Sequence, residues 1–449
     1  MKPLKIGIGG VRGLVGQTFT PELAATFAQA FGTYLEGGRV LVSRDTRPSG
    51  PMVTAAVSAG LLAAGCEVVD LGIAPTPSLQ LAVGWLDARG GIAVTAGHNP
   101  SGWNALKFVR GDGLYLNDRQ AEELLDVYHQ GEFAKAPWDR IHPAIARRDA
   151  IEHHLDALRA AFDVEAVRAR GLRVAVDCAN GACARLVPRW LDLLGCDVLA
   201  INDDVTAPFP HDPEPRPDTS AQAAALVRAG RADLGFVHDA DGERLGLVDE
   251  TGRALSEERT LTLAVAIRLA ERVGPVVTNV STTGAIDTVA ARHGAPVVRT
   301  PVGQANVSEA MIEHGAVIGG EGNGGVALPE IHATHDSAAA IGLVAEHLAT
   351  SGRALSALVA DLPVLTMLKE RVPVAPEAIY SALSEFREAV ADERGAVADT
   401  TDGVKLAWPD GWVHVRASNT ESLIRVIAEA ATPERAAELV DWARERLGR

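Results

Sequence analysis

The chain has little cysteine, little positive charge and no long apolar run, and each of these absences excludes a class of protein. Four cysteines in 449 residues, with no C-x-x-C pair among them, are too few for a disulfide framework. Three of them stand beside valine-rich runs, so we expect them to be small buried apolar side chains. The four are Cys66, Cys178, Cys183 and Cys196.

The balance of charge is acidic, with a formal net charge of −16. A nucleic-acid-binding surface needs a basic patch, so we expect no nucleic-acid partner. A phosphorylated ligand would instead be held by a few focused arginines and backbone N–H groups, helped by a cation. No segment approaches the roughly 20 apolar residues of a membrane span, and Met1-Lys2-Pro3-Leu4-Lys5 leads into glycines. We therefore expect a cytoplasmic protein with no membrane partner.

Length and composition predict several globular domains. A chain of 449 residues is too long for one hydrophobic core and suggests three or four domains. An apolar content of 47% with 22% charged residues is typical of a soluble globular protein.

A weak internal repeat runs through most of the chain. Each unit reads as a buried strand, a loop rich in Gly, Ser or Thr, an Ala/Leu-rich helix, a helix-stopping glycine and a second strand. The first strands are Arg39–Ser43, Arg173–Asp177 and Pro275–Asn279. The helix stop and the second strand after it lie together in Gly65–Val69, Gly195–Leu199 and Gly294–Val298. The pattern predicts three similar α/β domains with mixed sheets.

The end of the chain departs from this pattern. Val404–Trp408 and Trp412–Val415 predict two strands joined by a turn at Pro409-Asp410-Gly411. Thr432 and Pro433 then begin a closing helix. Its apolar residues recur at helical spacing, at Ala436, Leu439, Val440, Ala443 and Leu447. A smaller α+β C-terminal domain follows from these elements.

We place four domains around a central cleft, with boundaries read from the same patterns. The domains are residues 1–152, 153–253, 254–366 and 367–449. The joining stretches are expected around Ala150 to Asp163, Thr251 to Glu257 and Pro363 to Val374.

Two loops, one in each of the first two domains, carry residues suited to chemistry. Thr95-Ala96-Gly97-His98-Asn99-Pro100-Ser101-Gly102-Trp103-Asn104, running on to Lys107, combines polar donors with a sharp Asn-Pro turn. Asp239-Ala240-Asp241-Gly242-Glu243-Arg244 alternates carboxylates in a tight glycine loop, which suits Mg²⁺ or another hard cation. Seen alone, the first could be a solvated turn and the second an acidic surface turn.

Two further loops lie in the third and fourth domains. Gly319-Gly320-Glu321-Gly322-Asn323-Gly324-Gly325 has a backbone able to approach a ligand closely, with an acceptor and a donor for vicinal hydroxyls. Arg416-Ala417-Ser418-Asn419-Thr420-Glu421, followed by Arg425, can form a nest for a phosphate. Seen alone, the first is typical of a flexible turn and the second of an exposed polar loop.

Taken in order, the four loops resemble those of the α-D-phosphohexomutases, which read T-A-S-H-N-P, D-G-D-G-D-R, G-E-x-S-G and R-x-S-G-T-E-P. Gly10-Val11-Arg12-Gly13 is similar to the G-I-R-G of that family, and Arg44-Asp45-Thr46-Arg47-Pro48-Ser49 also belongs to the resemblance. The similarity therefore extends over essentially the whole chain.

The resemblance implies a mechanism and a set of site residues. In the family, a phosphoserine coordinated to Mg²⁺ gives its phosphoryl group to a hexose phosphate, and the bisphosphate intermediate then returns its other phosphate to the serine. The partners implied are a hexose phosphate and a hexose bisphosphate, and a homodimer is allowed. The metal ligands would be Asp239, Asp241 and Glu243. The catalytic positions would be Gly97 (the phosphoserine position), His98, Lys107, Arg12 and Arg244. The substrate-binding residues would be Glu321, Asn323, Arg416, Ser418, Asn419, Thr420 and Arg425.

Gly97 departs from the family pattern at its centre, because glycine has no nucleophile. Three explanations stay open: an altered position in an otherwise ordinary enzyme, a hydroxyl supplied by Thr95 or Ser101, or a protein that binds sugar phosphates without turnover. The cation, sugar and phosphate loops remain recognisable, so we favour a variant of a working mutase.

Three segments indicate which sugar phosphate the protein would take: G-E-G-N-G-G from Gly320, R-A-S-N-T-E from Arg416, and Val302-Gly303-Gln304-Ala305-Asn306. They are most similar to phosphoglucosamine mutases and archaeal-type phosphomannomutases, and phosphoglucosamine mutase is our first interpretation. Phosphomannomutase, phosphoglucomutase and a noncatalytic sugar-phosphate-binding homologue stay as alternatives.

Two histidine pairs could suggest a second metal site. His332 with His335, and His153 with His154, lack a third ligand at suitable spacing. We expect them to be ordinary histidines at the surface or behind the site.

Overall fold

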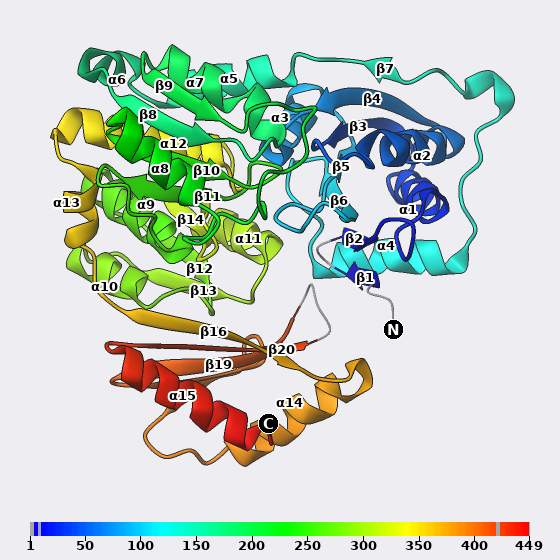
Figure 1. The fold of residues 1–449 in the computed structure, drawn as a ribbon. Coiled ribbons are helices and arrows are strands. Elements are labelled where there is room, and N and C mark those ends of the chain that lie inside the picture. The colour runs from blue at the N-terminus through cyan, green and yellow to red at the C-terminus, as the bar shows by residue number, and fades with distance from the viewer. Residues whose placement is uncertain (1–3, 8–9, 419–422, 449) are drawn as a thin grey trace.

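The computed structural model describes residues 4–7, 10–418 and 423–448 of the chain, and it contains four sheets with their own helices (Figure 1). Each sheet with its helices forms one domain, and the fourth domain, orange to red in Figure 1, lies below the other three in this view. Within the described residues, none of the helices has the length and apolar character needed to span a membrane.

The first domain is built on a seven-stranded sheet in the order β1-β2-β6-β5-β3-β4-β7. Its strands are β1 (Leu4–Gly7), β2 (Gly10–Leu14), β3 (Gly38–Arg44), β4 (Cys66–Ile73), β5 (Gly90–Val94), β6 (Trp103–Arg110) and β7 (Ile145–Ala146). Its helices are α1 (Pro21–Tyr34), α2 (Gly50–Ala63), α3 (Thr76–Trp85) and α4 (Asp118–Gln130). A capping box between Asn117 and Gln120 begins α4, and Gly131 in the left-handed conformation ends it.

The second and third domains each have a four-stranded sheet. The second contains β8 (Arg173–Asp177), β9 (Asp197–Ile201), β10 (Leu234–His238), β11 (Leu245–Asp249), α5 (Ala150–Ala161), α6 (Val164–Arg170), α7 (Val187–Leu193) and α8 (Ala221–Gly230). The third contains β12 (Val276–Asn279), β13 (Val297–Thr300), β14 (Ile318–Glu321), β15 (Gly325–Ala327), α9 (Glu257–Glu271), α10 (Ala285–Arg292), α11 (Gln304–His314), α12 (Ser337–Ser351) and α13 (Leu355–Ala360).

The predicted repeat is confirmed by strand order. The sheets of domains II and III run β9-β8-β10-β11 and β13-β12-β14-β15, and domain I contains the same unit as β4-β3-β5-β6. In each unit three strands are parallel and the last is antiparallel. The predicted helix stops at Gly65, Gly195 and Gly294 have φ of 87°, 71° and 66°, a conformation that favours glycine.

The fourth domain is an antiparallel sheet in the order β16-β20-β19-β18-β17, with two helices. Its elements are β16 (Thr366–Pro373), β17 (Val397–Asp399), β18 (Val404–Trp408), β19 (Gly411–Ala417), β20 (Leu423–Ala430), α14 (Ile379–Ala389) and α15 (Pro433–Arg446). The predicted strand pair and closing helix are both present, and the Thr432 side chain caps α15 by accepting from the Arg435 N–H.

Domains II and III share one hydrophobic core, whereas domains I and IV have cores of their own. Trp190 of α7 is fully buried in the shared core, and its indole N–H donates to the Ala338 carbonyl of α12 at 3.1 Å. Ten of the residues of α12 are buried, so this helix packs apolar side chains on most of its surface.

Two of the predicted joining stretches are regular elements instead. Residues 150–161 form helix α5, which packs against α3 of domain I, and residues 366–373 form β16 inside the fourth sheet. The buried residues of α5 include Ile151, Leu155 and Leu158 at helical spacing, and β16 pairs with β20 along its whole length. The exact domain boundaries stay a prediction.

Candidate active site

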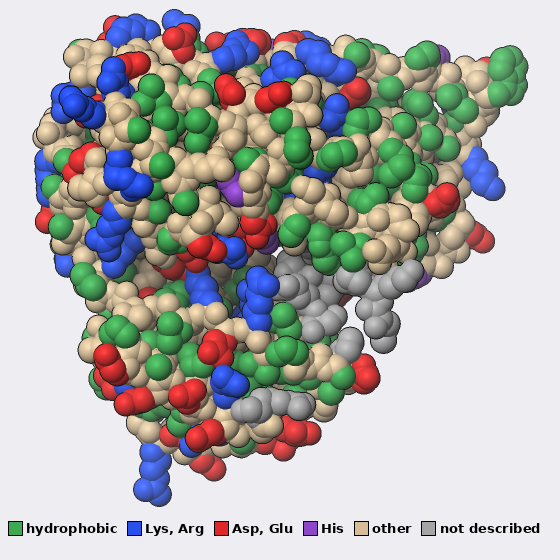
Figure 2. All heavy atoms as spheres, viewed as in Figure 1, with side chains coloured by type: hydrophobic (Ala, Val, Ile, Leu, Met, Phe, Trp, Pro, Cys, Tyr) green, Lys and Arg blue, Asp and Glu red, His purple; other side chains and the backbone are tan. Residues whose placement is uncertain are grey.

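Three of the four predicted loops occupy the same place in the three repeats. Residues 95–102 join β5 to β6, residues 239–244 join β10 to β11, and residues 322–324 join β14 to β15. Each loop therefore leaves the third strand and enters the antiparallel fourth. The fourth predicted loop begins with Arg416 at the end of β19. On the face seen in Figure 2, Lys/Arg and Asp/Glu side chains line a hollow between domain IV and the domains above it.

Arg47 and Asp45 determine the shape of the first loop. The fully buried Arg47 guanidinium pairs with Asp45 at 2.8 Å and donates to the Gly97 and Asn99 carbonyls at 2.7 and 2.6 Å. Thr95 donates to Asp45 at 2.7 Å and accepts from the Gly97 N–H at 2.9 Å. The loop backbone is thus held by a buried ion pair whose members sequence reasoning had not assigned to the site.

Gly97 is buried and lies between two charged groups. Its φ is +55°, and a Cβ built there would lie 3.5 Å from both Asp241 Oδ1 and Lys107 Nζ. These are ordinary contact distances, so a small side chain fits. Lys107 Nζ lies 2.7 Å from Asp241 Oδ2 and 2.6 Å from Glu243 Oε2. Burial alone would lower the pKa of Lys107, but these two carboxylates outweigh burial and raise it.

The structure leaves the other two hydroxyls of the loop poorly placed as nucleophiles. Thr95 is 1% exposed, and its hydroxyl is already engaged with Asp45 and the Gly97 N–H. Ser101 is exposed at the outer end of the loop.

The cation loop is held by backbone as well as by side chains. Asp239 Oδ1 accepts from the N–H groups of residues 242, 243 and 244 at 2.9 to 3.2 Å. Thr76, at the start of α3, donates its hydroxyl to Asp241 Oδ2 at 3.0 Å. Glu243 accepts from Lys107 and the Tyr115 hydroxyl. Domain I therefore positions a loop that belongs to domain II.

The three acidic residues differ in their fitness as metal ligands. Asp241 Oδ1 is buried, lacks a hydrogen-bond partner among the described residues and lies closest to Gly97. The Glu243 carboxylate already accepts hydrogen bonds from Lys107 and Tyr115. In the ranges 4–7, 10–418 and 423–448, no cluster of three His, Cys, Asp or Glu side chains is arranged to hold a metal. The residues present fit a cation on Asp241 with Asp239 beside it; Glu243 fits less well.

The electrostatics of this loop are set by burial and by Lys107. Burial and the Asp241 charge raise the pKa of Asp239 well above its ordinary value. Burial opposes ionisation of Asp241 too, but the Lys107 ammonium outweighs it and lowers the pKa of Asp241 to about 2. Without a bound cation, the loop therefore keeps Asp241 ionised and disfavours a second charge on Asp239.

His98 lies in a strongly positive environment. Burial lowers its pKa well below the ordinary value, and nearby positive charges add to the effect. These charges belong to Arg244, Arg12, Lys107 and Arg425. Arg12 also donates to Asn99 Oδ1 at 2.5 Å. His98 is thus a neutral imidazole where cations from three domains gather, as an anionic ligand requires.

The sugar loop is ordered by contacts to Glu321. Its Oε1 accepts from Asn279 Nδ2 at 2.6 Å and from the Gly303 N–H at 2.9 Å, while Asn323 Nδ2 lies 3.3 Å from Oε2. Asn323 Oδ1 accepts from the Gly325 N–H, which shapes the turn itself. Glu321 is therefore oriented from outside its own loop.

The phosphate loop is described only in part. Arg416 Nε lies 2.9 Å from Asp402 Oδ2, and Arg425 Nε donates to Ser418 Oγ at 3.4 Å. Asn419 and Thr420 fall outside the described residues.

Gln304 and His335 lie between the cation loop and the sugar loop, and the sequence did not predict their contacts. Gln304 oriented with its amide N toward Glu243 Oε1 (3.0 Å) accepts at its oxygen from the His335 N–H (2.8 Å). The imidazole of His335 packs against Gly325, where an added Cβ would lie 2.4 Å from the ring. In the sequence, Gln304 belongs to a segment that resembles the family, but no local pattern indicates a contact with Glu243.

The histidines expected to be ordinary are partly buried connectors. His154 is fully buried and bonds Ser78 Oγ and Asp336 Oδ2, each at 2.8 Å, and His332 bonds the same Asp336 oxygen at 3.0 Å. Ser78 belongs to domain I and Asp336 to domain III. Of the two expected placements, at the surface or behind the site, burial of His154 and His335 excludes the surface for both, because domain packing encloses them.

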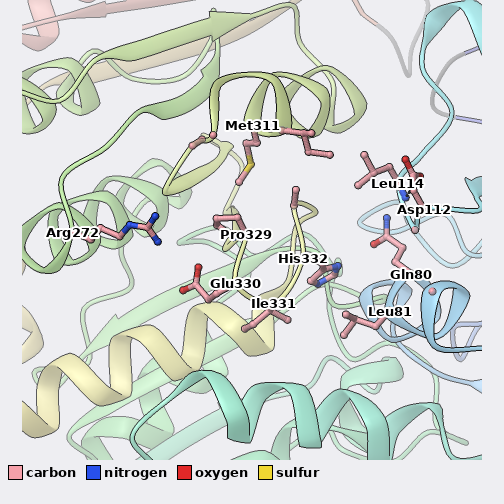
Figure 3. A pocket seen from close by; sticks show the side chains of 16 residues that line it. Gln80, Leu81, Asp112, Leu114, Arg272, Met311, Pro329, Glu330, Ile331 and His332 are labelled. Carbon is pink, nitrogen blue, oxygen red and sulfur yellow. Dashed lines mark hydrogen bonds between the residues drawn. The ribbon is translucent and has the colours of Figure 1, made fainter.

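A separate cavity of about 640 Å³ lies between domains I and III (Figure 3). Gln80, Leu81 and Leu114 face it from one side, and Met311 and Pro329 from the other. None of the candidate site residues that the structure describes lines this cavity.

Comparison with known proteins matches all four domains to one family. Models described as phosphoglucomutase/phosphomannomutase match α/β/α domain I at residues 3–135, domain II at 152–252, domain III at 258–365 and the C-terminal domain at 371–445.

Two relatives and a solved structure are similar to this chain over nearly its full length. A phosphoglucomutase/phosphomannomutase of Thermococcus kodakarensis is 37% identical, covering 97% of this chain and 96% of the relative. A protein of Methanopyrus kandleri named probable phosphoglucosamine mutase is 38% identical with the same coverage. The crystal structure of a phosphoglucomutase/phosphomannomutase family protein from Burkholderia thailandensis has a TM-score of 0.85 at 27% identity, covering 98% of this chain and 96% of that one.

Proposed function

Because the chain belongs to the phosphoglucomutase/phosphomannomutase family of enzymes, we propose that its cleft binds hexose 6-phosphates, hexose 1-phosphates and the bisphosphate between them. Glucosamine phosphate is the first choice of substrate, since the relatives include proteins named for that sugar. Glucose and mannose phosphates are the alternatives.

The observation that carries the proposal is the space at Gly97. A side chain there would meet Lys107 and Asp241 at 3.5 Å, inside the cluster of cations around His98. Lys107, Arg12 and Arg244 would neutralise a phosphoryl group at this point. Glu321 and Asn323 would read the sugar, and Arg416, Ser418, Asn419, Thr420 and Arg425 would hold the other phosphate.

A magnesium ion would be held by Asp241 and Asp239, with Glu243 as the weaker candidate. Bound there, Mg²⁺ would supply positive charge that offsets charge on a phosphoryl group. The neutral His98 and the ammonium of Lys107 are the groups able to accept and donate protons beside it. Lys107 also occupies the carboxylate oxygens that a cation would share, so we expect weak Mg²⁺ binding without a phosphorylated ligand.

Phosphoryl transfer through a covalent carrier requires a hydroxyl that Gly97 lacks. Thr95 is engaged and buried and Ser101 is exposed, so neither replaces it well. The unaltered chain therefore has the site of a mutase without a nucleophilic side chain at position 97. A sugar-phosphate-binding role without turnover is the second candidate, and Gly97 is the observation that favours it.

The test restores the nucleophile. Gly97→Ser, treated with hexose 1,6-bisphosphate, should interconvert the 6- and 1-phosphates far faster than the unaltered chain, and the rate should fall when Mg²⁺ is removed. The left-handed backbone costs serine about 1 kcal/mol, which the fold can tolerate. Gly102→Ser is the matched control, because it adds a serine to the same loop with only Leu14 Cδ2 nearby, at 3.9 Å.

The outcomes separate the candidates. No activity of Gly97→Ser on glucosamine, glucose or mannose phosphates would favour the binding role. Strong activity of the unaltered chain, with Thr95 or Ser101 phosphorylated by mass spectrometry, would show that one of those hydroxyls is the carrier.

A further inference from the structure

Asp402 joins two parts of the site that belong to different domains. Its Oδ2 accepts from the backbone N–H of Val302 in domain III at 3.0 Å and from Arg416 Nε in domain IV at 2.9 Å. The Asp402 side chain is 20% exposed and that of Arg416 only 5%, so the ion pair is shielded from water. A charge-assisted hydrogen bond of this kind is stronger than one between neutral groups.

The residue next to Val302 reaches the sugar loop. The N–H of Gly303 donates to Glu321 Oε1 at 2.9 Å. Successive N–H groups of one segment therefore bind two carboxylates, Asp402 from domain IV and Glu321 of the sugar loop. A shift of Asp402 would move the 302–303 segment and, with it, a donor that orients Glu321.

The position of Asp402 is itself fixed by its neighbours. Gly403 has a φ of +70°, and a Cβ there would lie 2.4 Å from the Val415 carbonyl, so only glycine allows this approach to β19. The Asp402 carbonyl accepts from His414 Nε2. A rigid turn thus presents the carboxylate to domain III.

We propose that Asp402 is a positioning residue that couples recognition of the sugar by Glu321 to retention of the phosphate by Arg416. The inference rests on the proposed function of these two residues. A phosphate that engages Arg416 holds Asp402 in place, and Asp402 then keeps the 302–303 segment set for Glu321. A sugar without phosphate meets a Glu321 that is less firmly oriented.

The first test needs no ligand. In Asp402→Ala, hydrogen exchange measured by mass spectrometry should accelerate in residues 301–304. In Asp402→Asn, whose amide oxygen can still accept from Val302, exchange should stay closer to the wild-type rate. Asp410→Ala is the matched control, since Asp410 is also an ion-paired aspartate of domain IV, bound to Arg435 at 2.8 Å, but is 59% exposed. It lies in the turn after β18, at the opposite end of that strand from Asp402.

The second test measures affinity for glucosamine, glucose and mannose 6-phosphates by calorimetry. Asp402→Ala should weaken binding by about ten-fold, the loss expected for one hydrogen bond to a charged group. In a Glu321→Ala background, the fold-loss in affinity caused by Asp402→Ala should be at least about three times smaller than in the wild type, because the two residues act through one segment. Asp410→Ala should bind like the wild type.

The results distinguish this inference from the proposed function. Unchanged exchange at 301–304 in Asp402→Ala, or affinity losses that simply multiply in the double variant, would overturn the coupling. Failure of the wild-type chain to bind any of the three hexose 6-phosphates would overturn the proposed function, and the exchange result would still judge whether Asp402 positions the segment.

Discussion

At the scale of single residues, the site depends on buried charges that shape backbone. Arg47 shows this most clearly, because its guanidinium bonds Asp45 and the carbonyls of Gly97, Asn99 and Pro100 while being fully buried. Without it, the carbonyls would lose their donor and Asp45 its charge partner. The geometry of the first loop therefore rests on a residue that does not face the cleft.

Replacing Arg47 by methionine should destabilise the protein by about 3–5 kcal/mol, the cost of leaving one partner of a buried ion pair uncompensated. The matched control is Arg119→Met, whose pair with Glu123 is exposed and should contribute less than about 1 kcal/mol. Urea unfolding of both variants measures the difference. Equal losses would show that the buried pair does not hold the loop.

At the scale of elements, helix starts organise the centre of the molecule. Asp336 caps α12 by accepting from the N–H groups of Ala338 and Ala339, at 2.9 and 3.2 Å. Its other oxygen binds His154 and His332, so one carboxylate begins a helix and joins two histidines. The next residue, Ser337, donates its N–H to the Gly242 carbonyl in the cation loop at 3.0 Å. The start of α12 therefore supports the cation loop from domain III.

Asp336→Ala should cost more than the loss of an ordinary cap. A helix cap alone is worth about 1 kcal/mol, whereas the buried Asp336 also satisfies two histidines, so we expect a loss of roughly 3 kcal/mol or more. Asp163→Ala is the matched control, because Asp163 caps α6 through a single bond to the Ala166 N–H near the surface. Thermal and urea unfolding compare the two. A loss no larger than that of Asp163→Ala would refute a role for the histidine contacts.

At the scale of the whole molecule, polar contacts attach domain IV to domain III. Glu429 of β20 accepts from the Gly284 N–H at 2.7 Å and from Trp412 at 2.9 Å, and Lys405 donates to the Val280 carbonyl at 2.7 Å. His414 bonds Ser281 Oγ at 2.9 Å in the same interface. Burial lowers the pKa of His414 to about 4, with the nearby Arg416 and Lys405 charges acting in the same direction.

This lowered pKa predicts a loss of stability in acid. In the unfolded chain histidine titrates near 6.5, so between pH 6.5 and 4 the unfolded state binds a proton that the folded state does not. Stability is present above pH 6.5 and falls as the pH drops towards 4, by roughly 3 kcal/mol from this group. Urea unfolding at several pH values should show a smaller acid loss in His414→Gln than in the wild type. The exposed His142, changed to glutamine, should keep the wild-type profile; an unchanged profile in His414→Gln would contradict the prediction.

Local patterns in the chain were enough to predict the repeat, the character of each loop and the family resemblance. Strand runs, helix stops such as Gly65 and turn residues act over a few positions, so their physics is visible in the chain. The same is true of the missing nucleophile at Gly97, which needs no coordinates to be recognised.

How these pieces meet depends on the packing of strands and domains in three dimensions. Lys107 pairs with Asp241 and Glu243 more than a hundred positions away because domains I and II pack together. Arg47 reaches the Gly97 loop because β3 and β5 are neighbours in one sheet. The joining role of Asp402 and the burial of His154 likewise arise from domain packing. Contacts between residues distant in sequence leave no periodic pattern, and for that reason the partners of the predicted site residues could not be derived from the chain alone.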